Sequence, residues 1–175
     1  MTEKSSPVIR HAEADDAGLL AELGARLFSE TFAAYNTPED MAAYLAASFG
    51  QAQQAAELSD PCSTFLIAEI DGVAVGYARL YSGAAPDGVA DEKPIELARL
   101  YASQEWFGRG VGSALMRVCI DEAQQQRYRT LWLGVWEHNN RARAFYRKWK
   151  FREVGEHIFQ LGDDSQTDIL MERSI

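Results

Sequence analysis

The sequence predicts a single domain of mixed α/β class over residues 1–175, with helices on both faces of a largely antiparallel sheet. Three observations support this prediction. The chain has the length of one ordinary domain, and its 47% hydrophobic residues suffice for a sizeable core. Apolar, β-prone runs alternate with segments of helical periodicity along the whole chain. Their expected order is β-α-α-β-β-β-α-β-α-β-β, which mixes direct strand connections with helical ones.

The first third of the chain indicates one short strand and two helices. Residues 8–10 are β-prone, and Asp15 or Asp16 can cap the helix that follows. A second helix begins after Thr37, its expected N-cap, with Pro38 at the first helical position. Apolar side chains recur at helical spacing in both: Leu20, Leu23 and Leu27, then Met41, Tyr44, Leu45 and Phe49. Three aromatic side chains near the junction either pack in the core or line a substrate pocket: Phe28, Phe32 and Tyr35.

The middle of the chain indicates a hairpin, a loop, a third strand and a helix. Residues 65–70 and 73–81 are apolar and β-prone, and the Asp71-Gly72 pair between them is a strong hairpin signal. Residues 82–93 are rich in Gly, Pro and Asp and predict a surface loop. Residues 94–101 predict the next strand. Residues 110–126 then have one apolar helical face, formed by Val111, Ala114, Leu115, Val118 and Ala123.

The last third predicts three strands and one helix. Residues 130–136 are nearly all apolar, as in a strand that is covered on both faces. Asn139 or Asn140 can cap a helix whose apolar positions are Ala142, Phe145, Tyr146 and Trp149. Two final strands are expected at 151–161 and 167–173, with a turn at Gly162-Asp163-Asp164.

The acidic composition limits the classes of partner. A net charge of −9 makes nucleic acid an unsuitable partner, because a phosphate backbone requires a basic surface. A cationic substrate such as an amine is favoured instead. No run is long enough to span a membrane, and the polar start at residues 2–6 lacks the apolar region of a signal peptide. Cys62 and Cys119 have no metal-type spacing, and Cys119 fits a helix core. We therefore expect a cytoplasmic protein without a membrane partner or a metal site.

One short segment is strongly basic. Between Ala12 and Leu58 the sole base is Arg26, whereas six bases crowd one later stretch: Arg141, Arg143, Arg147, Lys148, Lys150 and Arg152. Two interpretations stay open. The bases form either a solvated helix face or a basic rim beside an anionic cofactor.

The stretch 100–114 combines the end of a strand, a glycine-rich loop and the start of a helix. Gly108, Gly110 and Gly112 allow the backbone to come close to a ligand, and a helix N-terminus offers unpaired N–H groups. This combination suits a phosphate or pyrophosphate. It is neither a P-loop, which requires Gly-Lys-Ser/Thr, nor the G-x-G-x-x-G of dinucleotide sites. A plain turn between strand and helix is the alternative.

Three segments together resemble the GNAT family of N-acetyltransferases: the loop 107–112, the strand 96–101 before it, and the helix 139–146. The family has a (Gln/Arg)-x-x-Gly-x-Gly/Ala loop and a downstream Asn-x-x-Ala-x-x-x-Tyr helix, and its element order matches almost the whole chain. The resemblance implies a six- to seven-stranded sheet with a splayed central strand pair, about four helices, and acetyl-CoA as cosubstrate. Two residues depart from the pattern. Phe107 replaces Gln or Arg, and Lys150 replaces a glycine.

The resemblance also implies which residues bind acetyl-CoA. Backbone groups of Leu100 and Ala102 would pair with the amides of the pantetheine arm as an added strand does. The N–H groups of the glycine loop would hold the pyrophosphate. The implied set is Leu100, Tyr101, Ala102, Phe107, Gly108, Arg109, Gly110, Val111, Gly112, Ser113, Asn139 and Tyr146.

Two residues are candidates for the proton transfers. Tyr146 matches the family position whose hydroxyl faces the departing sulfur, and a phenol can protonate a thiolate; the alternative is a buried core tyrosine. Glu96 resembles the base of the family's histone-acetylating members, and its alternative is a strand residue in an ordinary ion pair. Glu69, Glu137 and His138 are weaker candidates for the base.

The predicted activity is acetyl transfer from acetyl-CoA to a primary amine of a small molecule or peptide. The acidic N-terminal half and the tail, which looks like that of bacterial enzymes acting on spermidine-type amines, favour a polyamine-like acceptor. Acetylation of a protein N-terminus or lysine is an alternative, and so is a CoA-binding sensor without catalysis. The sequence leaves open the acceptor, the use of other acyl groups and the oligomeric state, a homodimer included.

Overall fold

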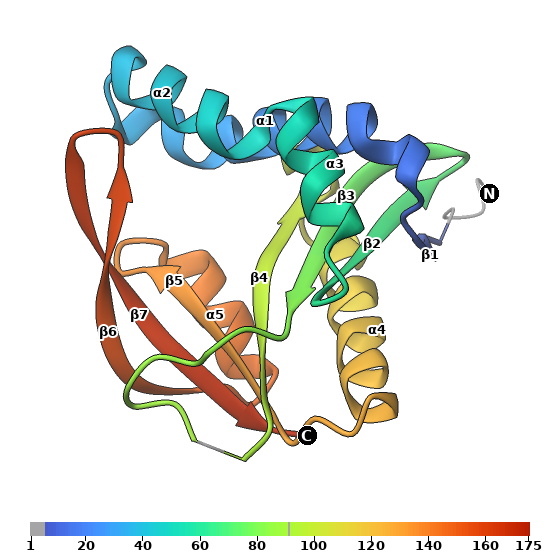
Figure 1. The fold of residues 1–175 in the computed structure, drawn as a ribbon, viewed down its shortest axis with the longest axis vertical. Coiled ribbons are helices and arrows are strands. Elements are labelled where there is room, and N and C mark those ends of the chain that lie inside the picture. Colours follow the sequence, from blue (N-terminus) through green and yellow to red (C-terminus); the bar gives the residue numbers. More distant parts are fainter. Residues whose placement is uncertain (1–5, 91) are drawn as a thin grey trace.

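A computed structural model of the chain describes residues 6–90 and 92–175 (Figure 1). Residues 2–5 of the polar start and Asp91 of the expected loop lie outside the described residues. Seven strands form one sheet: β1 (Val8–His11), β2 (Ser63–Ile70), β3 (Val73–Tyr81), β4 (Pro94–Ala102), β5 (Thr130–Trp136), β6 (Arg152–Leu161) and β7 (Asp164–Ser174). The α-helices are α1 (Ala17–Phe32), α2 (Pro38–Phe49), α3 (Gln51–Ser59), α4 (Val111–Gln125) and α5 (Asn140–Lys148). The predicted fold class is confirmed.

The central strands of the sheet separate along their length. The sheet order is β1-β2-β3-β4-β5-β7-β6, and its one parallel pair is β4 with β5. These two strands pair only from Pro94 to Glu96 with Thr130 to Trp132, and beyond this point they part (Figure 1). On its other edge β4 carries one extra residue, Ala98, between its pairings with Leu80 and Arg79. The splayed strand pair expected of the family is therefore present.

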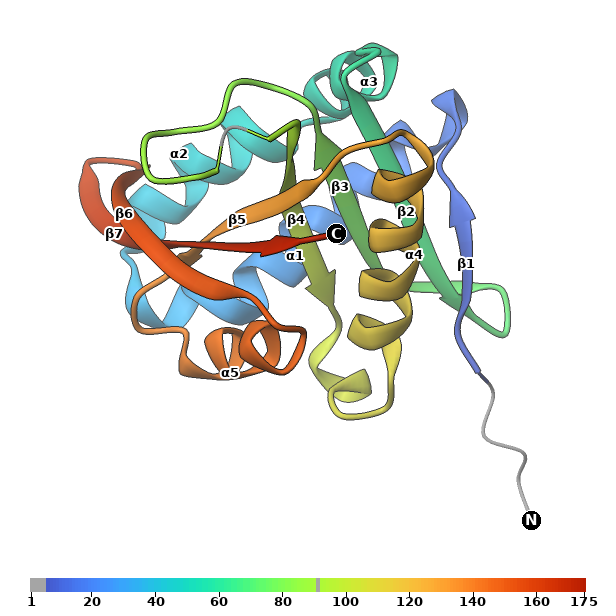
Figure 2. The same ribbon diagram turned by 90° about the horizontal axis from the view of Figure 1, so that it is seen from below.

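Helices cover both faces of the sheet. Helices α1, α2 and α3 lie on one face, and α4 and α5 lie on the other (Figures 1 and 2). The larger core lies between the sheet and α4 and includes Leu115, Leu133 and Cys119, all fully or almost fully buried. A smaller core beneath α1 includes Leu20 and Leu27. Cys119 is thus a core residue, as predicted. No helix within the described residues combines the length and apolar composition that a membrane crossing requires.

The helix starts follow the sequence signals in part. Thr37 caps α2 as predicted, and its hydroxyl accepts a hydrogen bond from the Asp40 N–H at 3.1 Å. Asp16 stands at the N-cap position of α1, but its side chain makes no capping bond to that helix. Its carboxylate instead accepts two hydrogen bonds from Arg10 at 2.8 and 2.9 Å. The predicted cap is corrected because a guanidinium is the stronger partner for this carboxylate.

The last hairpin turns more tightly than expected. Leu161 pairs directly with Asp164, so the turn consists of Gly162 and Asp163 alone. Gly162 takes the left-handed conformation at φ 60°, which a two-residue hairpin turn favours. Strand β7 therefore begins at Asp164 rather than at Thr167.

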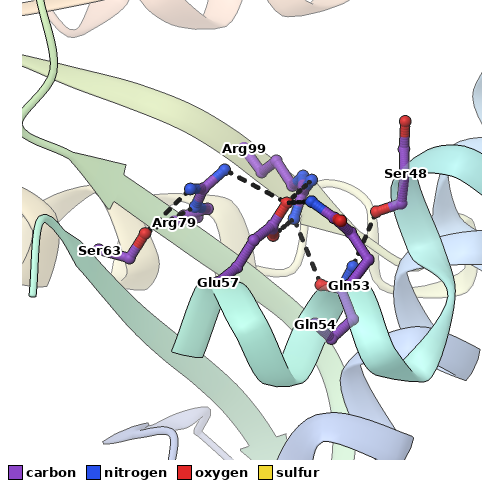
Figure 3. A network of polar contacts seen from close by, with 7 residues as sticks. All are labelled: Ser48, Gln53, Gln54, Glu57, Ser63, Arg79 and Arg99. Carbon is purple, nitrogen blue, oxygen red and sulfur yellow. Dashed lines mark hydrogen bonds and ion pairs between the residues drawn. The ribbon is translucent and has the colours of Figure 1, made fainter. Parts of the chain in front are cut away.

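Helix α3 is absent from the sequence prediction because its buried side chains are polar. Gln54 and Glu57 are buried, at 0% and 8% exposure. Figure 3 shows them beneath two arginines of the sheet, Arg79 and Arg99. The Glu57 carboxylate lies 2.6 Å from Arg99 Nη1 and 3.6 Å from Arg79 Nη1. Gln54 donates to the Ser48 carbonyl at 2.8 Å. Hydrogen bonds and ion pairs therefore hold this helix on the sheet, together with an apolar contact of Leu58 with the core beneath α1.

The arginines keep Glu57 ionised. Burial raises the pKa of the Glu57 carboxyl, but the hydrogen bonds and charge of Arg99 outweigh burial and leave the pKa below its usual value. A carboxyl with a lowered pKa stabilises the fold above its unfolded-state pKa. That contribution is lost as the pH falls through the folded-state pKa.

We predict that Glu57→Gln lowers the free energy of unfolding at pH 7 by about 3 kcal/mol, because it leaves two buried arginines without their carboxylate. Urea denaturation of variant and wild type measures the difference. Glu22→Gln, on the exposed face of α1, is the matched control and should change stability by less than about 0.5 kcal/mol. A loss below about 1 kcal/mol for Glu57→Gln would contradict the structural role given to this network.

Candidate functional site

The glycine loop presents open backbone at the start of α4. Gly108 and Gly110 have positive φ values of 71° and 91°, which glycine adopts without strain. A Cβ at either position would meet no atom within 4 Å, so this side of the loop is open to a ligand. The next N–H groups, from Val111 to Ser113, belong to the first turn of α4 and have no carbonyl of a preceding turn to bond. The loop therefore fits an anionic diphosphate.

Phe107, which departs from the family pattern, contacts an arginine of helix α5. The Arg141 guanidinium of α5 lies over the Phe107 ring at 3.2 Å from its centroid. Both residues line the same cavity as the glycine loop, and so does Lys148. Arg109 does not line that cavity, and its guanidinium lies 5.2 Å from the centroid of the Trp106 ring.

Five of the six clustered bases divide into two groups. Arg143 and Arg147 both bind Glu153 at 2.7 Å, and Arg152 binds Glu172 at 2.8 Å. Arg141 and Lys148 instead line the cavity. The solvated face and the basic rim are therefore both present, on different residues. Lys150 adopts φ 69°, the left-handed conformation that glycine favours, so the turn after α5 keeps its shape without glycine.

The gap between β4 and β5 leaves backbone groups of β4 unpaired by a neighbouring strand. The N–H of Ser103 donates to the Val75 carbonyl at 2.8 Å, and Tyr101 pairs with Tyr77 in the same register. Since alternate residues of a strand direct their backbone groups to opposite neighbours, those of Leu100 and Ala102 point into the gap. This edge can accept an extended ligand arm as an additional strand.

One cavity of about 1710 Å³ connects the loop, the gap and the opposite face of the sheet. It brings together nearly all the residues predicted to form the site: Glu96, Leu100, Tyr101, Ala102, Phe107, Gly108, Gly110, Val111, Gly112, Ser113, Asn139 and Tyr146. Within the described residues, no three His, Cys, Asp or Glu side chains are grouped so that they could hold a metal ion.

Tyr146 is buried and reaches the cavity from α5. Its helix starts at the predicted cap Asn139, whose side-chain oxygen accepts a hydrogen bond from the Ala142 N–H at 3.2 Å. The ring packs edge-on against Phe145 and Phe151. Burial raises the pKa of the Tyr146 hydroxyl, so this group stays protonated at neutral pH. The residue is thus both part of the core and part of the cavity wall.

The candidate bases occupy different surroundings. Glu96 is half-buried at the closed end of the gap, where burial raises the pKa of its carboxyl and the charges of Arg79 and Arg99 oppose that rise. Glu69 lies outside the cavity and accepts a hydrogen bond from Arg10 at 2.9 Å. Glu137 lines a smaller neighbouring pocket, with His138 at 3.4 Å, and His138 lines both pockets.

The far end of the cavity has an aromatic wall. It is formed by Phe28, Phe32, Tyr35, Tyr44, Trp136 and Phe159, from α1, α2, β5, β6 and the turn after α1. The aromatic residues at the helix junction line the cavity, and Phe28 also belongs to a hydrophobic core cluster against which Phe32 packs, so both interpretations left open above apply. Asp168 of β7 also lines the cavity, although it is not among the site residues predicted from the sequence. Burial raises the pKa of this carboxyl to about 6. In the sequence, the one indication of a functional role for Asp168 is that it is a single acidic residue at the start of a β-prone run.

Comparisons with known proteins show the family of the chain. The profile of the "Acetyltransferase (GNAT) family" matches residues 25–151. An uncharacterized N-acetyltransferase of Lactobacillus delbrueckii subsp. lactis is 34% identical over 148 residues, covering 85% of this chain and 86% of that protein. Another from Mycobacterium tuberculosis is 34% identical over 160 residues, covering 91% and 98%. The PaiA N-acetyltransferase of Thermoplasma acidophilum, solved with coenzyme A, shares the fold with a TM-score of 0.77, 21% identity, and coverage of 97% and 99%.

The chain belongs to the GNAT family of acetyltransferases. The resemblance found in the sequence is thereby confirmed, together with the enzyme class, an N-acetyltransferase, and its cosubstrate, acetyl-CoA.

We predict that Arg141→Gln weakens acetyl-CoA binding about tenfold, because it removes a cation that lines the cavity beside the glycine loop. Isothermal titration calorimetry with CoA measures the change. Arg147→Gln removes the same charge from the same helix, away from the cavity, and should leave the Kd within about twofold. Equal effects of the two substitutions would mean that Arg141 acts only through the overall electrostatic potential of the protein.

Proposed function

We propose that the protein transfers an acetyl group from acetyl-CoA to a primary amine, with a polyamine-like amine as the preferred acceptor. The amine attacks the thioester directly, and Tyr146 acts as general acid. The observation that carries this proposal is the single cavity. It joins a phosphate-binding loop, an unpaired strand edge, a protonated phenol and an acidic, aromatic acceptor end.

The cosubstrate would lie along the open end of the splayed strands. N–H groups of the loop from Gly108 to Ser113 would bind its pyrophosphate. Backbone groups of Leu100 and Ala102 would pair with the pantetheine amides. This arrangement directs the thioester through the gap toward the face beneath α1 and α2, where the amine enters.

The proton transfers follow from the two titratable groups of the cavity. A primary ammonium has a pKa of about 10.4, so it loses a proton, to Glu96 directly or through water, before it can attack. The nitrogen then forms a bond to the thioester carbonyl carbon, the C–S bond breaks, and the nitrogen loses its second proton to water. The departing thiolate takes the proton of the Tyr146 hydroxyl, which solvent later restores. The products are an N-acetyl amine and CoA.

The preference for a cationic acceptor rests on charge. The protein carries a net charge of −9, and the acceptor end of the cavity contains Asp168 and a wall of aromatic rings. Carboxylates and aromatic faces both attract ammonium groups.

We expect Tyr146→Phe to lower kcat at least about tenfold while the Kd for acetyl-CoA stays unchanged, because it removes the hydroxyl and keeps the ring. Release of CoA thiol, measured with a panel of amines and peptides, reports the rate. Tyr128→Phe, which removes a hydroxyl outside the cavity, should retain wild-type rates.

The same assay separates the alternatives. Turnover with peptides alone would favour a protein acetyltransferase. A wild type that binds acetyl-CoA but releases no thiol with any acceptor would favour a sensor and exclude the proposed activity.

For Glu96→Gln we expect kcat/KM at pH 7 to fall by about tenfold or more, because the base is lost. The deficit should shrink toward pH 10, where free amine is abundant without a base. A pH profile of kcat/KM tests this, with Glu69→Gln as the control outside the cavity. A deficit that stays constant across the pH range would rule out the base role for Glu96.

A further inference from the structure

Asp168 is a half-buried carboxylate at the acceptor end of the cavity. It lies in β7 opposite Trp136 of β5 and His157 of β6. Its side chain is 13% exposed. Among the described residues its one ion-pair neighbour is His157, whose Nε2 lies 3.7 Å from Asp168 Oδ2. A carboxylate that is largely removed from water requires a cationic or hydrogen-bonding partner.

Two other buried carboxylates of the protein, Glu57 and Glu172, have such a partner within the chain. Arg99 lies 2.6 Å from Glu57, and Arg152 lies 2.8 Å from Glu172. No arginine or lysine forms an ion pair with Asp168 within the described residues. The resulting excess of negative charge faces the cavity, which suits a cation supplied by the ligand.

The sheet leaves space beside the Asp168 carboxylate. Gly134 is exposed in the middle of the otherwise buried strand β5, and it lines the cavity together with Asp168. A Cβ at position 134 would lie 3.1 Å from Asp168 Oδ2, tighter than ordinary van der Waals contact. The glycine therefore keeps both the carboxylate and the space beside it in place.

Aromatic rings surround the same space. Trp136 lies 5.8 Å from Phe32 and 5.0 Å from Tyr35, measured between ring centroids. Across the cavity, Tyr44 lies 5.5 Å from Phe159. Aromatic faces stabilise an ammonium group without hydrogen bonds, and they also pack against methylene groups.

Building on the proposed function, we propose that Asp168 and this aromatic wall bind a second, non-reacting ammonium group of the acceptor, so that the enzyme selects linear diamines and polyamines over monoamines. A carboxylate stabilises the charged form of a bound amine, whereas the attacking nitrogen must be neutral. Asp168 therefore suits the nitrogen that stays charged. The smaller pocket of about 240 Å³ beyond Tyr35 and Trp136 leaves room for a longer chain.

The test compares 1,4-diaminobutane with 1-aminobutane, two acceptors of equal carbon chain that differ in the second ammonium. We expect the wild type to favour the diamine in kcat/KM by about tenfold. Asp168→Asn should remove this preference by raising the KM for the diamine about tenfold. The KM for 1-aminobutane and the kcat for both amines should stay within about twofold.

Two further variants control for a general loss of folding or activity. Asp163→Asn removes a carboxylate from the exposed turn of the same hairpin, and it should retain the preference. Gly134→Ala leaves the charge unchanged but crowds Asp168, and it should weaken diamine binding selectively. Calorimetry with acetyl-CoA checks that each variant still binds the cosubstrate.

The outcomes separate this inference from the proposed function. Equal loss for both amines in Asp168→Asn, or no loss for either, would overturn the second-ammonium subsite and leave amine acetylation intact. Binding of acetyl-CoA without transfer to any amine by the wild type would overturn the proposed function itself, and this inference with it.

Discussion

The brief pairing of β4 with β5 is the constraint on which the rest of the molecule depends. Three residue pairs hold the strands together at one end, and the sheet is otherwise continuous on either side. Because the strands part (Figure 1), Leu100 and Ala102 keep backbone groups available for a ligand. One cavity is lined by residues of α4 and α5 on one face of the sheet and by residues of α1 and α2 on the other. A fully paired sheet would close this passage. The opening costs ladder hydrogen bonds, which a bound pantetheine arm would restore.

The buried and half-buried carboxylates discussed above fall into two groups. Glu57 and Glu172 lie against arginines and hold the fold together, Glu57 through a network that joins α3 to the sheet (Figure 3). Glu96 and Asp168 line the cavity, and burial raises the pKa of both. Carboxyls with a raised pKa in a cleft are typical of functional positions. Arginines form ion pairs with the first two, whereas within the described residues no arginine or lysine forms one with Glu96 or Asp168.

The two departures from the family pattern have local explanations. Phe107 offers no polar side chain to a phosphate, but its ring supports the guanidinium of Arg141, which comes from a helix more than thirty residues later in the chain. Lys150 adopts the left-handed conformation that glycine would otherwise supply, so α5 still turns into β6. In both cases the geometry of the site is kept by a different residue type.

The sequence by itself determined the order and class of most elements, the caps Thr37 and Asn139, the glycine loop, and the family. These features depend on neighbours in the chain, such as periodicity, cap residues and turn glycines. The tertiary structure alone decided that α3 exists, that Asp16 binds Arg10 rather than capping α1, and that Asp168 faces the cavity beside Gly134. Each of these depends on a partner from a distant strand or helix. Burial of a polar side chain is favourable only when such a partner is present. Because the partner is distant in the sequence, a local pattern does not reveal it.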